Sequence, residues 1–156
     1  MSKVLQERLH TRRVPSPEDA ALLNLLVAAG HMRDRFDEIC AEHGLTGAQY
    51  NVLRILRGGP DGGTARCEVA ERMVDRSPDV TRLEDRLEKQ GLVERFRCEE
   101  DRRLSLACVT AKGLELLDRI DPAMERAGRA FGERLGEADC RELSRICECI
   151  YGPEKA

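Results

Sequence analysis

The sequence predicts a mainly α-helical fold with one small β-hairpin, an α+β class. Apolar residues recur at three- and four-residue spacing along most of the chain, which is typical of amphipathic helices. After Gly91 two short runs, residues 92–97 and 104–109, suit strands, and the polar segment between them suits a hairpin tip. The 156 residues are enough for one compact domain with additional helical arms.

Composition limits the classes of partner. Hydrophobic residues make up 41% and charged residues 35%, with a net charge of −3, so a surface for nucleic acid has to be local. The N-terminus lacks the apolar run of a signal peptide, and no segment is long enough to cross a bilayer, so we predict a cytoplasmic protein without membrane contact. The seven cysteines, an odd number, indicate free thiols rather than a disulfide framework.

Helix start and stop signals divide the N-terminal half. Residues 1–15 are expected to form a loose arm or a short helix, and Ser16 to cap a long helix that ends near Gly44. The segment from Thr46 to Gln49 has the pattern of a capping box and opens a second helix. A glycine-rich loop at residues 58–63 follows, after which Thr64 is expected to cap a short third helix.

Residues 77–95 form the most informative segment. A helix is predicted to start at Ser77 and to end at Gly91. At about 100° per residue, three apolar side chains fall on one side and a polar set falls opposite. The apolar residues are Val80, Leu83 and Leu87, and the polar set is Pro78, Thr81, Arg82, Asp85 and Lys89. A short helix, a tight turn, a second helix with a free polar face and a hairpin follow the order of a winged helix-turn-helix.

That element order predicts binding to double-stranded DNA, with the second helix in the major groove. Arginine can bridge the two acceptors of a guanine edge, and threonine can meet a thymine methyl group. The predicted DNA contacts are Arg66, Ser77, Pro78, Thr81, Arg82, Asp85, Arg86, Arg102 and Arg103. Acids equal bases in number between Arg76 and Arg103, and helical spacing turns Glu84 and Glu88, but not Glu94, away from the arginines.

Long helices are predicted again after the hairpin. Thr110 is expected to cap a helix that bends at Pro122 and breaks at Gly136. A final helix carries apolar residues such as Leu143 and Ile150.

Several motifs together resemble the MarR family of bacterial transcription regulators. They are Val69-Ala70-Glu71-Arg72-Met73, the segment 77–95, Asp101-Arg102-Arg103 at the hairpin tip and Val109-Thr110-Ala111-Lys112-Gly113. The resemblance implies a homodimeric repressor that binds a pseudo-palindromic operator and is released by a small-molecule effector. It implies one chain, 1–156, with a winged lobe at 46–110 and dimerisation helices at 16–44 and 111–151. Asp101 would support the wing, and Arg102 or Arg103 would contact the minor groove.

The resemblance also implies an effector, and three kinds stay open. A small aromatic ligand would bind between the dimerisation helices and the lobe, near His31, Arg35, Phe36, Tyr50 and Arg54, although Phe36 and Tyr50 also suit an ordinary core. Thiol-based redox sensing would use one or more of Cys67, Cys40, Cys140 and Cys147. Each of them could equally be a small buried residue that only fills space in the core. Metal sensing lacks a paired CxxC or HxxxH pattern, so we predict no metal site and no cofactor.

Two other classes of protein compete with a regulator. An enzyme is disfavoured because none of the three histidines lies in a nucleophile, phosphate-loop or metalloprotease motif. A helical dimerisation module that binds another protein would show no salt-dependent DNA binding, whereas a regulator should release DNA as salt rises.

Overall fold

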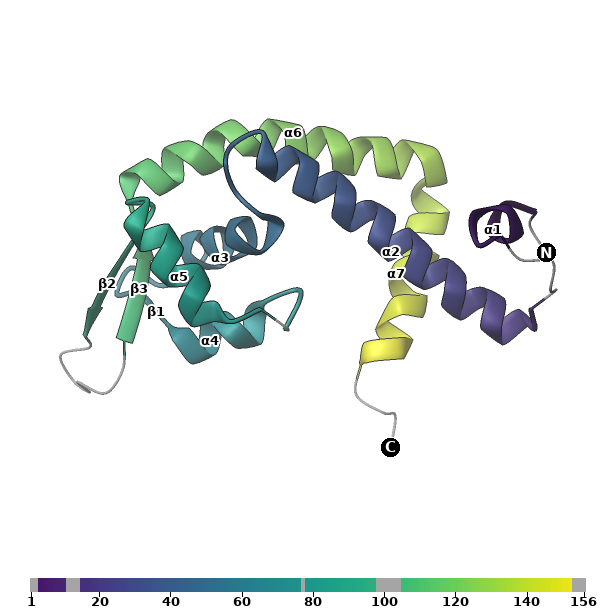
Figure 1. Cartoon of the computed structure of the whole chain (residues 1–156), viewed down its shortest axis with the longest axis horizontal. Coiled ribbons are helices and arrows are strands. Elements are labelled where there is room, and N and C mark those ends of the chain that lie inside the picture. The colour runs from purple at the N-terminus through teal and green to yellow at the C-terminus, as the bar shows by residue number, and fades with distance from the viewer. Residues whose placement is uncertain (1–2, 11–14, 77, 98–104, 153–156) are drawn as a thin grey trace.

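The computed structural model describes residues 3–10, 15–76, 78–97 and 105–152. Figure 1 shows short helices and a small sheet gathered at one end of the molecule, with long helices leading away from them. The helices of the described residues are α1 (Lys3–Arg8), α2 (Pro17–Ala41), α3 (Gly47–Arg57), α4 (Arg66–Arg72), α5 (Val80–Lys89), α6 (Ala111–Leu135) and α7 (Glu137–Tyr151). The strands are β1 (Thr64–Ala65), β2 (Val93–Arg97) and β3 (Ser105–Val109). Every predicted helix is therefore present, and the predicted hairpin is confirmed.

The predicted helix signals hold at most element boundaries. The Ser16 hydroxyl accepts a hydrogen bond from the Asp19 amide at 3.1 Å, which caps α2. Thr46 and Gln49 exchange side-chain and backbone hydrogen bonds of 3.2 and 2.9 Å, so the capping box of α3 is confirmed. Thr110 caps α6 by accepting from the Gly113 amide at 3.1 Å. Gly136, at φ 83°, ends α6.

Two predicted details differ from the structure. Thr64 does not cap α4: it lies in β1 opposite Ala107, because its extended backbone adds a third strand to the sheet, in the order β1-β3-β2. Helix α5 begins at Val80 rather than Ser77, because the Asp79 carboxylate accepts from the Thr81 and Arg82 amides. Pro122 lies inside α6, which is one helix on both sides of it, so the bend expected there stays a prediction.

The main hydrophobic core lies between α3, α5, the sheet and the first half of α6. Leu53, Leu87, Leu117 and Ile120 are its largest fully buried apolar side chains. We call α3, α4, α5 and the sheet the lobe. The core joins the lobe to the start of α6 and, through Cys40, to the end of α2.

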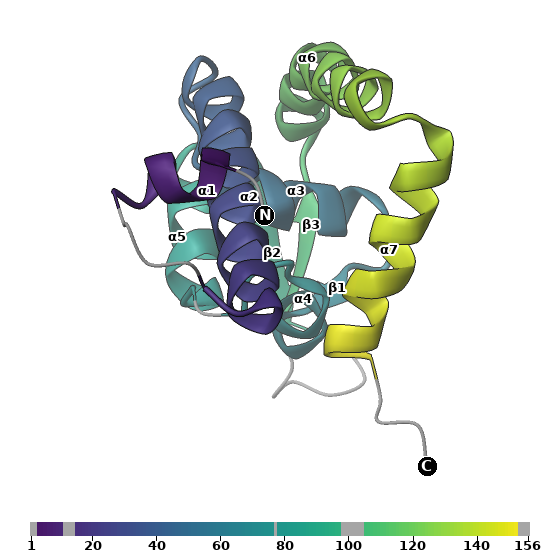
Figure 2. The same cartoon turned by 90° about the vertical axis from the view of Figure 1, so that its right-hand side faces the viewer.

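The long helices contrast with the lobe. Helix α2 buries only Ala20 and Cys40 of its 25 residues, and the 15-residue helix α7 buries none. Figure 2 shows α2 and α7 on opposite sides of the molecule, with α6 above α7. Their apolar stripes are present as predicted, but much of each stripe faces outward. The exposed large apolar residues on these two helices are Leu22, Leu26, Phe36, Leu143, Ile146, Ile150 and Tyr151.

Candidate nucleic-acid interface

Helices α4 and α5 form a helix-turn-helix whose turn is held by the lobe. The Asn51 side chain on α3 accepts a hydrogen bond from the Val74 amide at 2.9 Å. Asp79 then accepts from the amides of Thr81 at 3.0 Å and Arg82 at 3.3 Å, so α5 has a well-formed start. Pro78 lies just before the helix, and Thr81 and Arg82 lie in its first turn. Ser77 lies outside the described residues.

Helix α5 has two distinct sides. Val80, Leu83 and Leu87 are buried in the core, which confirms the predicted apolar side. Arg82, Arg86 and Lys89 are exposed on the opposite side. The Arg82 side chain is 81% exposed, and its Nε lies 3.3 Å from an oxygen of Asp79. The side of α5 that faces away from the core is therefore rich in exposed donors.

Two acidic residues of this region, Glu84 and Glu94, are kept away from that basic side in different ways. Glu84 is 1% exposed, and its Oε1 has no hydrogen-bond partner among the described residues. Burial raises the pKa of Glu84, while the positive charges of Arg95 and Arg66 oppose the shift. Glu94 lies on the sheet opposite Cys108, one residue before Arg95. Because side chains alternate along a strand, Glu94 and Arg95 point to opposite faces of the sheet. Helical spacing in the sequence could not place Glu94 away from the arginines, because Glu94 lies on a strand.

Arg95 joins the strand β2 to helix α5. Its Nη1 lies 2.7 Å from the Asp85 carboxylate, its Nε donates to Glu88 at 3.0 Å, and its Nη2 also contacts Glu88. The hydrogen bond to Glu88, followed by the contacts with Asp85, raises the pKa of the Arg95 guanidinium. Arg95 was not among the predicted site residues. The sequence feature that could have predicted its position is the spacing from Val93. Residues two apart in a strand share a face, so the burial of Val93 puts Arg95 on the face of the sheet that α5 covers.

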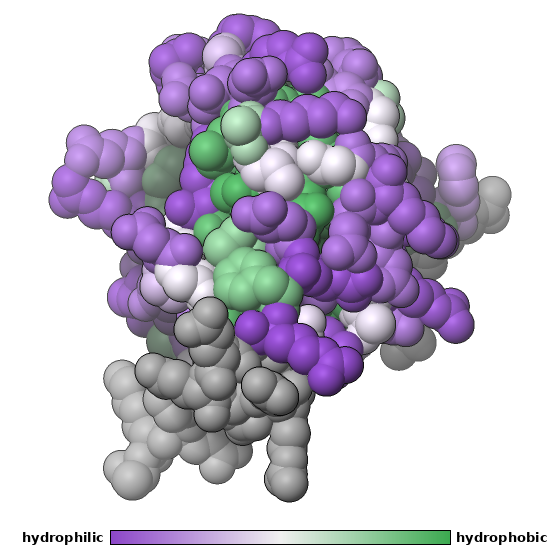
Figure 3. Space-filling model, turned by 90° about the vertical axis from the view of Figure 1, so that its left-hand side faces the viewer, coloured by the Kyte–Doolittle hydropathy of each residue, from purple (hydrophilic) through white to green (hydrophobic). Residues whose placement is uncertain are grey.

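The hairpin of β2 and β3, the wing, is antiparallel, with Phe96 opposite Leu106 and Arg97 opposite Ser105. Figure 3 faces the sheet end of the molecule and shows an apolar strip framed by hydrophilic side chains. Phe96, at 41% exposure, is the exposed large apolar side chain of β2. The predicted wing residues Asp101, Arg102 and Arg103 lie outside the described residues.

The start of α4 lies beside this region. Arg66 is its first residue and is exposed, and Cys67 follows it, also exposed. The end of α5 is tied to the start of α6, because the Lys112 ammonium donates to the Gln90 carbonyl at 2.7 Å and the Thr110 hydroxyl donates to the Gly91 carbonyl at 2.8 Å. A displacement of α6 would therefore act directly on the end of α5.

The predicted effector residues fall into two groups. Tyr50 and Arg54 meet at the junction of α3 and α6, where the Arg54 Nη1 donates to the Tyr50 hydroxyl at 3.1 Å and the Tyr50 hydroxyl lies 3.4 Å from Asp121. Burial is the largest influence on Tyr50 and raises its pKa. Arg57 contacts Asp121 at 2.7 Å, a pair that sequence analysis missed because its members are 64 residues apart. The other group, His31, Arg35 and Phe36, lies exposed on α2.

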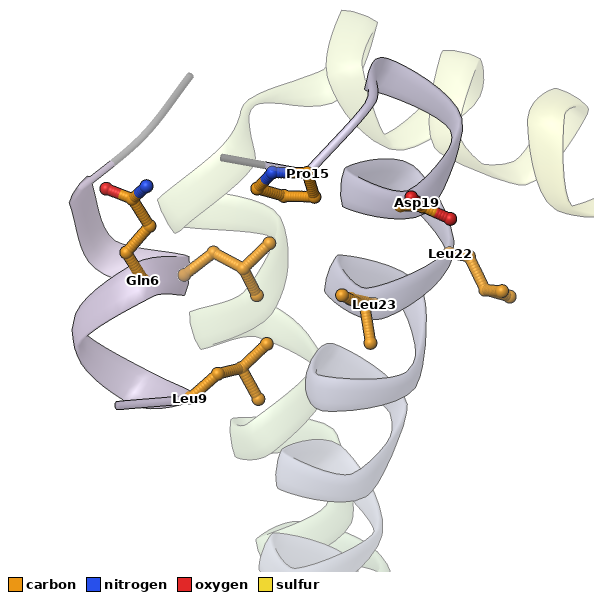
Figure 4. Close-up of a pocket in the computed structure, with 7 residues that line it drawn as sticks. Gln6, Leu9, Pro15, Asp19, Leu22 and Leu23 are labelled. Carbon is orange, nitrogen blue, oxygen red and sulfur yellow. The ribbon is translucent and has the colours of Figure 1, made fainter. Parts of the chain in front are cut away.

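The cavity found among the described residues does not lie at the predicted effector residues. A space of about 220 Å³ lies between α1 and the first turns of α2. Figure 4 shows Leu9, the residue after α1, pointing toward α2, where Leu23 lies. This volume is smaller than the roughly 300–1,000 Å³ of typical ligand pockets. Its lining is mostly apolar and includes none of the predicted effector residues.

The cysteines differ in their environments. Burial, reinforced by Asp37, raises the pKa of Cys40 to about 11, so this thiol is protonated at neutral pH and is a poor sensor. Cys67 is exposed, whereas Cys140 and Cys147 are half-buried on α7. Among the described residues no cluster of three or more metal-ligating side chains is present. No helix in this part of the chain is long and apolar enough to span a membrane.

Comparison with known proteins identifies this arrangement. The sequence profile of the MarR family matches residues 45–105. A solved MarR transcription factor from Planctomyces limnophilus is 34% identical, with a TM-score of 0.66 over 87% of this chain and 98% of that one. Sco3205, a MarR-family regulator from Streptomyces coelicolor solved in complex with DNA, is 26% identical, with a TM-score of 0.78 over 94% of this chain and 95% of that one.

A curated relative supports the same assignment. The homoprotocatechuate degradative operon repressor of Escherichia coli is 27% identical over 83% of this chain and 86% of its own length. The chain spans 67% and 63% of the length of the first two curated relatives it matches. Fold, motifs and relatives agree, and the chain belongs to the MarR family of winged-helix transcription regulators.

Proposed function

We propose that this chain is a homodimeric repressor that binds a pseudo-palindromic operator in the cytoplasm, without enzymatic turnover. The observation that carries the proposal is the basic side of α5: Arg82, Arg86 and Lys89 are exposed there, while Glu84 is buried and Glu88 is paired. In a helix-turn-helix this side enters the major groove, and the half-sites lie about one helical turn apart.

The predicted contacts divide by their place on the helix. Thr81 and Arg82, in the first turn, are proposed to read base edges. Ser77 and Pro78, which precede this turn in the sequence, are proposed to read base edges with them. The exposed Arg66 and Arg86 are proposed to bind the phosphate backbone. Arg102 and Arg103 are proposed to enter the minor groove, with Asp101 supporting the wing. The Asp85 carboxylate is held by Arg95, so we propose a supporting role for it instead of base reading.

The proposed dimer is supported by the long helices. A 15-residue helix that buries none of its residues gains little stability from its own subunit. Leu26 on α2 and Ile150 on α7 are 60% and 62% exposed, which is unusual for large apolar side chains that line up on helical faces. A second copy would cover both stripes.

The proposed effector is a small aromatic acid. A relative is named as the repressor of a homoprotocatechuate degradative operon, which supports an aromatic ligand. Tyr50 offers a ring and Arg54 a guanidinium at the junction of lobe and α6, and the two groups also stack at 5.9 Å. An acid that binds Arg54 in the released state more tightly than in the DNA-bound state would shift the lobe toward release. The alternative effector is an oxidant acting on the exposed Cys67.

The test is fluorescence anisotropy with duplex DNA flanking the protein's own gene. Wild-type protein should bind specifically, and affinity should fall steeply with salt. Arg82→Ala should weaken operator binding by about 1–3 kcal/mol and relax base preference. The matched control is Arg129→Ala, which removes an exposed arginine of α6 and should leave binding unchanged. Equal binding by Arg82→Ala and wild type would remove Arg82 from the base-reading set.

The effector is tested in the same assay. Release by benzoate-type acids, lost in Arg54→Ala, would support the aromatic effector. Release by peroxide, restored by reductant and lost in Cys67→Ser, would support thiol sensing instead.

A further inference from the structure

We propose that Arg95 is a positioning residue for DNA binding: from strand β2 it holds the Asp85 and Glu88 carboxylates against the wing, away from the basic side of α5. We call Arg95, Asp85 and Glu88 the acidic brace. The inference rests on the proposed approach of α5 to the duplex, but it concerns residues that need not contact DNA.

The geometry of the acidic brace is bidentate. The guanidinium directs Nη1 to Asp85 at 2.7 Å and Nε to Glu88 at 3.0 Å, with Nη2 also on Glu88. The Arg95 side chain is only 25% exposed, whereas the carboxylates it binds are 43% and 40% exposed. A planar guanidinium that spans two carboxylates fixes both of them, which a lysine cannot do.

The position of the acids on α5 explains why they need to be held. At about 100° per residue, Asp85 and Glu88 lie about 60° and 120° around the helix from Arg82, on the flank between the basic side and the wing. Arg86 and Lys89 lie within about 40° of Arg82. Two free carboxylates on this flank would face the phosphates on that side of the groove, and like charges that meet at an interface are strongly unfavourable.

Charge balance gives the same result. Helix α5 carries three bases, Arg82, Arg86 and Lys89, and three acids, Glu84, Asp85 and Glu88, so its net formal charge is zero. Glu84 is buried, and Arg95 contributes one positive charge between the other two acids. The side chains left free to meet DNA are then predominantly basic. The acidic brace therefore allows a segment with equal acids and bases to present a positive surface.

The test uses two duplexes, the flanking DNA of the gene and a mixed-sequence duplex of the same length. Arg95→Ala should weaken binding to both by about tenfold at low salt, since the freed carboxylates repel every phosphate backbone. The loss should shrink as salt rises, because screening weakens the repulsion. Adding Asp85→Asn and Glu88→Gln to Arg95→Ala should restore affinity to within about twofold of wild type. The matched control adds Glu94→Gln, an exposed acid on the other face of the sheet, and should restore nothing.

The outcomes separate three roles. Unchanged binding by Arg95→Ala overturns the acidic brace, while weakened binding by Arg82→Ala in the same assay leaves the proposed function standing. A loss that the two neutral substitutions do not restore also overturns it and makes Arg95 either a direct phosphate contact, if the salt slope flattens, or a purely structural residue, if thermal unfolding shifts as well. Wild-type protein that binds neither duplex overturns the proposed function and the acidic brace together.

A second variant keeps the test valid if Arg95→Ala does not fold. Asp85→Asn with Glu88→Gln, in the presence of Arg95, should bind both duplexes at least as tightly as wild type, because only negative charge has been removed. A tenfold loss in this variant would mean that the acids themselves are needed for binding and would overturn the proposal.

Discussion

The lobe and the long helices differ in how much of their apolar surface is buried within one chain. Helix α5 has 10 residues and buries four of them, Val80, Leu83, Glu84 and Leu87. Helix α7 is half as long again, with 15 residues, and buries none. The lobe is thus stabilised within one chain, whereas α7 and the outer face of α2 retain apolar stripes that a single subunit leaves in water. The stability of the lobe and the stability of the assembly should therefore respond to different mutations.

The largest expected effect is in the core of the lobe. Leu53→Ala removes a fully buried side chain of α3 and should lower the free energy of unfolding by about 2–5 kcal/mol. Urea denaturation measures this loss, which should be the same at every protein concentration. Ile146→Ala on α7 is the counterpart, and its loss should grow as the protein is concentrated into dimers. A loss at Ile146 that is independent of concentration would contradict the division between lobe and long helices.

The second effect is on assembly. Leu26→Glu on α2 or Ile146→Glu on α7 would put a charge into each proposed dimer stripe and should weaken dimerisation by about 2–3 kcal/mol. Analytical ultracentrifugation measures the dissociation constant, and far-ultraviolet circular dichroism checks that the helices remain. The control is Arg141→Glu, an exposed polar position on α7. Variants that stay fully dimeric would place the interface elsewhere.

Much of this fold followed from local patterns in the sequence. The capping residues Ser16, Thr46 and Thr110 were predictable because a cap depends on residues three positions apart. Thr64 was not, because its place in β1 depends on pairing with Ala107, 43 residues away. A two-residue strand also shows no alternation that could reveal it.

The candidate site divides in the same way. The exposed donors of α5, including Arg82, came from helical periodicity alone. The partners of Asp85 and Asp121 did not, because Arg95 and Arg57 reach them across the tertiary fold. The burial of Glu84 was also missed: spacing turned it away from the arginines, but only packing against the sheet and α4 decides whether such a side chain meets water.

The third effect is at the junction between the two regions. Asp121→Asn weakens the contact of α6 with Arg57, whose Nη1 lies 2.7 Å from Asp121, and should cost about 1–2 kcal/mol of unfolding free energy. Asp118→Asn is a matched control, since Asp118 lies 3.9 Å from the same Arg57 atom but is 77% exposed. Thermal unfolding of the two variants should therefore differ. Equal shifts would mean that the junction is held by apolar packing alone.

The smallest effect is the pH dependence of the lobe. Burial raises the pKa of Glu84 above its ordinary value of 4.5, so the folded state holds this proton more tightly than the unfolded state. The favourable contribution of the protonated carboxyl is fully present below about pH 4.5 and is lost as pH rises through the folded pKa. Glu84→Gln removes this titration, so its free energy of unfolding should match that of wild type near pH 4.5 and exceed it at pH 7.

Urea denaturation between these pH values measures the difference, with the exposed Glu94→Gln as the control that should track wild type throughout. The positive charges of Arg66 and Arg95 act in the opposite direction and favour the ionised carboxylate. If they dominated, Glu84→Gln would be less stable than wild type at pH 7, and the gap would widen with pH. Glu84 would then belong with Asp85 and Glu88 as a third acid held by Arg95, and the buried side of α5 would be stabilised by charge as well as by apolar packing.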